Sequence, residues 1–469
     1  MKISDKLFAA ERPVIGVRCV HLDLKGTPPS PGRLIKLLKV FSAARYNAVL
    51  VEWEDSFPWT VDRRFRSETA YSPATVKSFV KKAGELGIEL IPLVQCLGHM
   101  ETPLRLPEYA ALRENPCDET VLNPLAPGAR GLVEKMMADV LRLMPNVKRF
   151  HLGGDEALTF GTHPDTKQYI AKHGKGALYL HHVEPLLDKL AKLNIRPMLW
   201  HDMMRDWESS ALRRLARKAD LVVWGYSGHP YAMQKHCNRE MIERFAEHKI
   251  VMWGGTAYKG ADGMEADVPN IVRREENALG WVEVAKRHGF KGVIATAWSR
   301  YWTSGCQNEP IDGALDSALN VGVIMHDGKP PRDGIEACRK ILGRIGESRA
   351  VKTGAVLAKI SVARNNAWTG IRALRHLMVT IGQDHRRLPA FWTVRHLKNV
   401  RDEIICVEGV ANDLRKALKG LMEPVWVERY LAERIESLRG EFAALEAKAR
   451  QLSPAACSAL FDNRTTKSE

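Results

Sequence analysis

The sequence lacks several patterns that would assign a class of protein at once. Its eight cysteines are scattered with no CxxC pair, which argues against a disulfide scaffold and against a structural zinc site. No GxGxxG or Walker loop follows a strand-like run, so we expect no nucleotide cofactor. The sequence also contains no metal-ligand motif, so we expect no metal. Residues 1–13 hold charges and no apolar core of a signal peptide, and no apolar run reaches a membrane-spanning length. These absences predict a soluble, cytoplasmic protein that does not enter membranes.

The 55 acidic residues are too few to balance the 70 Lys and Arg residues, so the formal net charge is +15 and the pI is near 9.4. Part of this excess is local, because residues 352–398 hold nine Lys and Arg residues against a single acid, Asp384. No RNP-like, zinc-finger or helix-turn-helix signature accompanies these charges. We therefore expect a solvated basic helical surface and no nucleic-acid partner, with polyanion binding as the alternative.

What the chain does contain is a regular alternation of strand-like and helix-like segments. The helical stretches end repeatedly in Gly or Asn just before the next apolar run. Eight such units with nearly continuous apolar strands predict an α/β fold, a closed (β/α)8 TIM barrel over residues 1–330. The expected strands are 14–24, 48–53, 88–95, 147–152, 196–200, 221–224, 250–253 and 292–298.

Residues 331–469 are predicted to form a separate, mostly α-helical region with breaks at Pro389 and Pro424. Its last long stretch, 426–452, has apolar residues at helical spacing and mixed charges between them. This stretch could pack against the barrel or form the interface of a homodimer.

The most informative segment is His151-Leu-Gly-Gly-Asp155-Glu156. It places two glycines and then two adjacent carboxylates directly after a buried strand. Two carboxylates at the mouth of a strand can divide their work, one protonated as a general acid and the other ionised as an electrostatic partner. The alternative is an ordinary polar loop.

A second pattern lies at the carboxyl ends of the predicted strands. Polar residues follow the earlier strands, and aromatic residues follow the later ones. Because the carboxyl ends of all barrel strands converge on one face, these side chains are expected to surround a common site. Tryptophan faces stack on sugar rings, and acids, His and Arg bind sugar hydroxyls. The residues in question are Asp23, Glu52, Trp53, Glu54, Asp55, His99, Trp200, Asp202, Trp224, Tyr226, Trp253, Tyr258, Trp298, Arg300 and Tyr301.

These blocks resemble glycoside hydrolase family 20, the β-N-acetylhexosaminidases, and most closely its hexosaminidase D branch. The resemblance runs from about residue 18 to residue 310 and includes the blocks VHLDLKG (20–26), EWEDSFP (52–58), HLGGDE (151–156), LWHDM (199–203) and WSRY (298–301). The family's fold is a TIM barrel. The Trp-x-Glu that commonly follows the last strand in the family is absent here, since Ser299 and Arg300 follow Trp298.

The resemblance implies roles for individual residues. Glu156 would be the general acid/base, and Asp155 would orient the substrate's 2-acetamido group, whose carbonyl oxygen attacks the anomeric carbon. A tyrosine would bind the same group, either Tyr226 or Tyr258, with a slight preference for Tyr258. Further substrate contacts are expected from Arg18, Asp23, His99, His151, Trp200, Asp202, Trp224, Trp253, Trp298, Arg300 and Glu309.

The sequence thus predicts an exo-acting retaining β-N-acetylhexosaminidase that releases terminal β-linked GalNAc or GlcNAc through an oxazolinium intermediate. Its partner would be a small glycan or glycoconjugate substrate. A barrel that only binds glycans or another polyanion is the alternative, but such a module has no need for Asp155 and Glu156 together.

Overall fold

A computed structural model describes residues 7–233, 237–302, 305–384 and 390–452. The chain divides into two compact units, residues 1–351 and residues 352–469. In the first unit, eight parallel strands close into a barrel in the order β1-β10-β9-β8-β7-β6-β3-β2. The predicted TIM barrel is therefore confirmed.

The barrel strands match the predicted positions closely at seven of the eight places. Their bounds are β1 (Val17–Asp23), β2 (Ala48–Glu52), β3 (Glu89–Leu93), β6 (Arg149–His151), β7 (Arg196–Trp200), β8 (Asp220–Trp224), β9 (Met252–Lys259) and β10 (Gly292–Ala297). A short antiparallel hairpin, β4 (Arg113–Asn115) with β5 (Asp118–Leu122), lies in the connection after β3.

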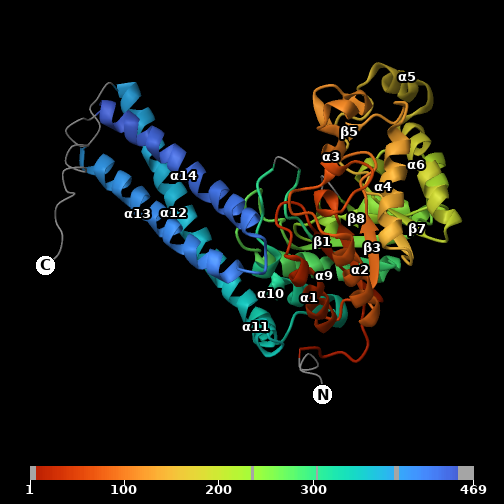
Figure 1. Cartoon of the computed structure of the whole chain (residues 1–469), viewed down its shortest axis with the longest axis horizontal. Helices are drawn as coiled ribbons and strands as arrows, with labels where there is room; N and C mark the ends of the chain where they lie inside the picture. The colour runs from red at the N-terminus through yellow and green to blue at the C-terminus, as the bar shows by residue number, and fades with distance from the viewer. Residues whose placement is uncertain (1–6, 234–236, 303–304, 385–389, 453–469) are drawn as a thin grey trace. The chain divides into compact units, whose positions relative to one another are not determined.

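Helices surround this barrel (Figure 1). They are α1 (Pro31–Ala43), α2 (Pro73–Glu85), α3 (Glu101–Leu104), α4 (Ala129–Leu143), α5 (Pro164–His173), α6 (Lys175–Lys192), α7 (Ser209–Ala216), α8 (Arg239–Glu247), α9 (Ile271–His288), α10 (Leu315–Asp327) and α11 (Gly334–Arg344). Ser30 and Ser72 cap α1 and α2 by accepting backbone N–H bonds, and a proline follows each cap directly.

Strand β9 is the exception to the predicted bounds, because it continues to Lys259 instead of ending at Trp253. Gly254 and Gly255 directly follow the predicted end of the strand, and in the structure they permit close packing against it. A Cβ atom on Gly254 would lie 2.8 Å from the Trp281 ring, and one on Gly255 would lie 2.9 Å from the Trp224 Cβ. The glycines thus let two tryptophans pack against a continuing strand.

The barrel interior is filled by side chains and is not a pore. Its lower layers are apolar, and Trp200 and Trp253 are among its largest members, both with no exposed surface. The other members include Cys19, Leu50, Ile91, Leu93, Met198, Val222 and Ile294. The interior also holds polar side chains, among them His21, Glu52 and His151, all buried.

The second unit consists of three long helices, α12 (Ser348–Asp384), α13 (Ala390–Leu418) and α14 (Pro424–Leu452). Figure 1 shows them side by side. Ion pairs join α13 to α14 through Arg415 and Glu428 and through Arg401 and Glu446, so these two helices run antiparallel. Pro424 is the first residue of α14, which agrees with the predicted break at this position. The other predicted break, Pro389, lies outside the described residues.

The division after residue 351 differs from the predicted boundary at 330. Helix α10 packs on β9, β1 and β10, and α11 packs on α10, so both helices belong with the barrel. Arg33 in α1 also forms an ion pair with Glu347, at 2.6 Å. The predicted homodimer stays a prediction. No described helix is long and apolar enough to cross a membrane.

Candidate active site

A pocket of about 180 Å³ lies at the carboxyl ends of the barrel strands. Its wall combines two carboxylates, a histidine and four aromatic rings, from the loops that follow β3, β6, β8 and β10. The lining residues are His99, Asp155, Glu156, Trp224, Tyr226, Trp298 and Tyr301. The structure therefore brings together the acid pair and several of the predicted strand-end residues.

Asp155 lies almost fully buried at the wall of this pocket, with 5% of its surface exposed. Its Oδ2 is 3.5 Å from His99 Nε2, whereas Oδ1 has no hydrogen-bond donor among the described residues. Burial raises the pKa of Asp155, and the nearby His99 opposes that rise. A buried acceptor without a donor costs about 1–3 kcal/mol, so this oxygen is suited to receive an N–H from a ligand.

Glu156 occupies a different environment, although it is the next residue. Its side chain is 46% exposed, and Oε2 lies 3.3 Å from His99 Nε2. Its backbone is left-handed at φ 45°, and its N–H donates to Asp202 Oδ2 at 2.9 Å. The two adjacent carboxyl groups therefore lie in different environments, Asp155 buried and Glu156 accessible from solvent.

Asp202 holds two parts of the wall in place. Besides the Glu156 N–H it accepts the Trp224 indole N–H at 3.4 Å. Burial raises the pKa of Asp202 to about 7, with a further rise from Asp155 and an opposing contribution from the Glu156 N–H. Asp202 does not line the pocket itself, so its contact with substrate stays a prediction.

His99 joins the two carboxylates from the loop after β3. Burial alone would lower the pKa of His99, but Asp155 and Glu156 raise it well above its usual range. The loop approaches the acid pair closely because residue 98 is glycine: a Cβ atom there would lie 1.8 Å from the Asp155 carbonyl oxygen. Glycine at this position thus permits the contact between His99 and both acids.

Trp224, Tyr226 and Trp298 form the aromatic part of the wall. Trp224 and Tyr226 stack, with ring centroids 5.3 Å apart and planes inclined by 16°. Trp298 lies 6.1 Å from Tyr226, and the ammonium of the buried Lys25 lies 5.7 Å from the centre of the Trp298 ring. These rings offer the stacking surface that a sugar needs.

Two predicted site residues lie at the opposite end of the barrel, so their predicted roles are wrong. Arg18 is the second residue of β1, and its guanidinium donates to the carbonyl oxygens of Ile15, Gly16 and Arg45. Trp253 is the second residue of β9, and its indole N–H donates to Asp220 at 3.0 Å. The cause in the second case is the length of β9, which carries the strand end six residues beyond Trp253.

The slight preference for Tyr258 over Tyr226 is also wrong. Tyr258 is fully buried in β9, and its hydroxyl donates to the His21 carbonyl at 3.2 Å. Tyr226 lines the pocket beside Trp224 and Trp298. Trp200 and His151 lie beneath the pocket in the barrel interior, with ring centroids 4.4 Å apart, and do not line it.

The remaining predicted residues form the structure behind the wall. Asp23 accepts the Ser299 N–H at 2.8 Å, Arg300 lies 3.5 Å from Asp55, and Glu309 accepts the Gly260 N–H at 3.0 Å. These contacts fix the loop after β10, which carries Trp298. Direct sugar contacts by Asp23, Arg300 and Glu309 stay predictions.

The sequence analysis gave no substrate role to one pocket residue, Tyr301, or to the ion cluster beneath the pocket. Tyr301 lines the pocket and donates to the Gly260 carbonyl at 2.6 Å; its place three residues after Trp298 was the available signal. Under the pocket, Glu52 lies 2.5 Å from Lys25 Nζ and 3.2 Å from His21 Nε2. Burial would raise the pKa of Glu52, but Lys25 and His21 bring it well below its usual range.

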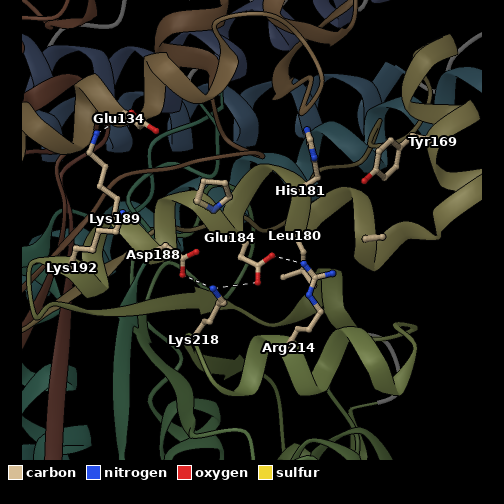
Figure 2. Close-up of a pocket in the computed structure, with 12 residues that line it drawn as sticks. Glu134, Tyr169, Leu180, His181, Glu184, Asp188, Lys189, Lys192, Arg214 and Lys218 are labelled. Carbon is tan, nitrogen blue, oxygen red and sulfur yellow. Dashed lines mark hydrogen bonds and ion pairs between the residues drawn. The ribbon is translucent and has the colours of Figure 1, made fainter.

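A larger hollow of about 790 Å³ lies elsewhere, on the outer side of the barrel along α6 (Figure 2). Its charged side chains pair with one another, Lys189 with Glu134, Lys218 with Asp188 and Arg214 with Glu184. Paired, solvated charges of this kind lack the buried carboxylate found at the strand ends. The smaller pocket is therefore the candidate active site.

Comparisons with known proteins identify the family of the chain. Residues 49–305 match the model of the glycosyl hydrolase family 20 catalytic domain. The chain is 32% identical to hexosaminidase D of Homo sapiens over 296 residues, 61% of this chain but only 60% of that protein. It is 32% identical to hexosaminidase D of Bos taurus over 323 residues, 66% of this chain and 92% of that protein.

Among solved structures, the fold resembles the β-N-acetylhexosaminidase from Bacteroides fragilis NCTC 9343. The TM-score is 0.53 at 15% identity, with 72% of each chain covered, so this likeness concerns the fold alone. The family match covers more than half of the chain and includes His99, Asp155, Glu156, Trp224 and Trp298. On this evidence, the chain belongs to glycosyl hydrolase family 20.

Proposed function

We propose that the protein is an exo-acting retaining β-N-acetylhexosaminidase that releases terminal β-linked GalNAc or GlcNAc by substrate-assisted catalysis. The observation that carries the proposal is the pairing of a buried Asp155, whose Oδ1 lacks a donor, with an accessible Glu156 in one aromatic pocket. The two hexosaminidase D relatives support the same activity.

The arrangement of the carboxylates favours a retaining mechanism over inversion. Oxygens of Asp155 and Glu156 lie within 4.8 Å of each other and approach the same His99 nitrogen. An inverting pair stands about 6.5–9.5 Å apart, with room for a water between the carboxylate and the far face of the sugar. Since both acids approach the same His99 nitrogen, the pair is too close to hold a water for inversion, and the proposed nucleophile is the acetamido oxygen of the substrate.

In the proposed reaction, Asp155 accepts the acetamido N–H and turns the carbonyl oxygen toward the anomeric carbon. That oxygen forms a bond to C1 while the glycosidic C1–O bond breaks, and Glu156 gives its proton to the leaving oxygen. Asp155 stabilises the positive charge of the resulting oxazolinium. Water then attacks C1, Glu156 takes the proton, and the acetamido group is restored with the original configuration at C1.

The dimensions of the pocket support exo action. About 180 Å³ is well below the roughly 300–1,000 Å³ of pockets that hold drug-sized ligands, so one sugar residue fits and an oligosaccharide does not. Trp224, Tyr226, Trp298 and Tyr301 surround that space. The aglycone would lie toward the exposed side of Glu156.

The test compares 4-nitrophenyl β-glycosides of GlcNAc and GalNAc with their 2-hydroxy counterparts, glucose and galactose. We expect turnover of the 2-acetamido sugars only, since an intramolecular nucleophile can supply about 7–11 kcal/mol of the barrier. A thiazoline mimic of the cyclised intermediate should inhibit competitively. Equal kcat/KM for β-galactoside and β-GalNAc, with no inhibition by the thiazoline, would refute the mechanism. Binding of all four sugars without hydrolysis would favour the glycan-binding alternative.

A further inference from the structure

His99, Asp155 and Glu156 form a group whose geometry matches a second kind of ligand. Each offers one atom, and these three atoms lie within 4.8 Å of one another. His99 Nε2 is 3.5 Å from Asp155 Oδ2 and 3.3 Å from Glu156 Oε2. In a tetrahedral zinc site with bonds of about 2.0–2.2 Å, neighbouring ligand atoms stand about 3.3–3.6 Å apart. The two distances from the histidine agree with these values, and the two carboxylate oxygens, which lie within 4.8 Å of each other, need only a small approach.

We propose that these three side chains bind one Zn²⁺ ion, which inhibits the enzyme by occupying the place of the sugar. Imidazole nitrogen and carboxylate oxygen are both zinc ligands, and three protein ligands with a fourth position open to water is the arrangement of catalytic zinc sites. Mg²⁺ and Ca²⁺ prefer six or more oxygens and are poorly suited to a site with a histidine and three protein ligands.

The backbone holds these ligands in place independently of an ion. Gly98 lets the loop of His99 lie against the Asp155 carbonyl, as described above, and His99 itself adopts φ 54°. Glu156 is fixed at φ 45° by its N–H bond to Asp202. Because the loops already have the required geometry, zinc binding would cost little reorganisation.

A second observation also points to a ligand at this place. Asp155 is nine-tenths or more buried, and its Oδ1 has no donor among the described residues although the side chain lines the pocket. A water on the open position of the zinc ion would be a donor for this oxygen.

The inhibitory effect rests on the proposed function, but binding does not. An ion held by Glu156 and Asp155 removes both the proton donor and the group that orients the acetamide. Zinc would therefore compete with substrate, raising the apparent KM while leaving kcat unchanged. Dialysis of the full-length protein against EDTA should leave activity intact, because the ion is an inhibitor and not a cofactor.

Binding is tested on the full-length protein by calorimetric titration with ZnCl₂ and by the visible spectrum of added Co²⁺. We expect one ion per chain and a tetrahedral Co²⁺ spectrum without thiolate charge transfer. His99→Gln should weaken binding at least tenfold. His181→Gln, on the exposed face of α6 in Figure 2, is the matched histidine control and should bind as the unmodified protein does.

The outcomes separate this proposal from the proposed function. Unchanged binding in His99→Gln, or a thiolate band from exposed cysteines such as Cys117 or Cys406, would overturn the zinc site. Hydrolysis of the acetamido substrate with no zinc binding would leave the proposed function standing alone. Zinc binding without any hydrolysis would support the site and reject the activity.

Discussion

Replacing Asp155 with asparagine tests the part of the site on which the mechanism depends most. The substitution keeps the size of the side chain and removes its charge. The carboxylate already lies 3.5 Å from one cationic group, His99, and its side chain lines the pocket where the oxazolinium charge would develop. Two unit charges about 4 Å apart at an effective dielectric constant near 20 interact by about 4 kcal/mol.

Since about 1.4 kcal/mol corresponds to a tenfold change in rate, Asp155→Asn should lower kcat for the 2-acetamido substrate by about 10³-fold. KM should change much less, because the charge appears in the transition state and not in the bound substrate. The assay is steady-state hydrolysis of 4-nitrophenyl β-GlcNAc and β-GalNAc. No preference for 2-hydroxy sugars should arise, because asparagine supplies no nucleophile.

Asp220→Asn is the matched control for this variant. Asp220 is 3% exposed, as deeply buried as Asp155, but it lies at the start of β8 beside Arg196, at the other end of the barrel. Its substitution should lower the free energy of unfolding and leave kcat per folded molecule unchanged. A loss below tenfold in Asp155→Asn, or an equal loss in both variants, would contradict the charge argument.

Three further predictions follow from other parts of the site. Glu156→Gln should lower turnover of a natural disaccharide by about 10²–10⁴-fold and should affect the hydrolysis of activated aryl glycosides less. The melting temperature should change little, because the Glu156 side chain is 46% exposed. Equal losses of turnover on both substrates would argue against proton donation by Glu156. Trp298→Ala should raise KM, because Trp298 lines the pocket. Trp253→Ala should lower the free energy of unfolding in urea by about 3–5 kcal/mol and leave KM unchanged, because Trp253 fills the barrel interior. A raised KM in Trp253→Ala would contradict this placement. The pKa of Asp202 is about 7 in the folded protein and about 4 in the unfolded chain, so the unfolded carboxyl loses its proton first and the free energy of unfolding should fall as pH rises from about 4 to about 7. Urea unfolding across this pH range should show a smaller fall in Asp202→Asn than in the unmodified protein. Equal falls in the two proteins would exclude Asp202 as the cause.

The sequence by itself determined the barrel and the position of its acid pair. Apolar periodicity, helix caps and chain-reversing glycines are local properties, so the eight units could be counted along the chain. The His151–Glu156 block placed two carboxylates after a strand, and the closure of the barrel then placed them at the strand mouths. The family resemblance added roles for Asp155 and Glu156 that no local pattern contains.

The tertiary structure alone decided which of the aromatic and charged residues face the pocket. The end of β9 depended on whether Gly254 and Gly255 turn the chain or make room for Trp281 and Trp224, and the sequence does not show those partners. For the same reason Trp200 and Trp253 could not be told apart from Trp224 and Trp298 in advance. Side chains on a barrel strand alternate between the barrel interior and the surrounding helices. The height of each side chain along the barrel axis follows from the register between neighbouring strands. Small differences in strand length and register therefore separate a sugar-binding surface from a packed core.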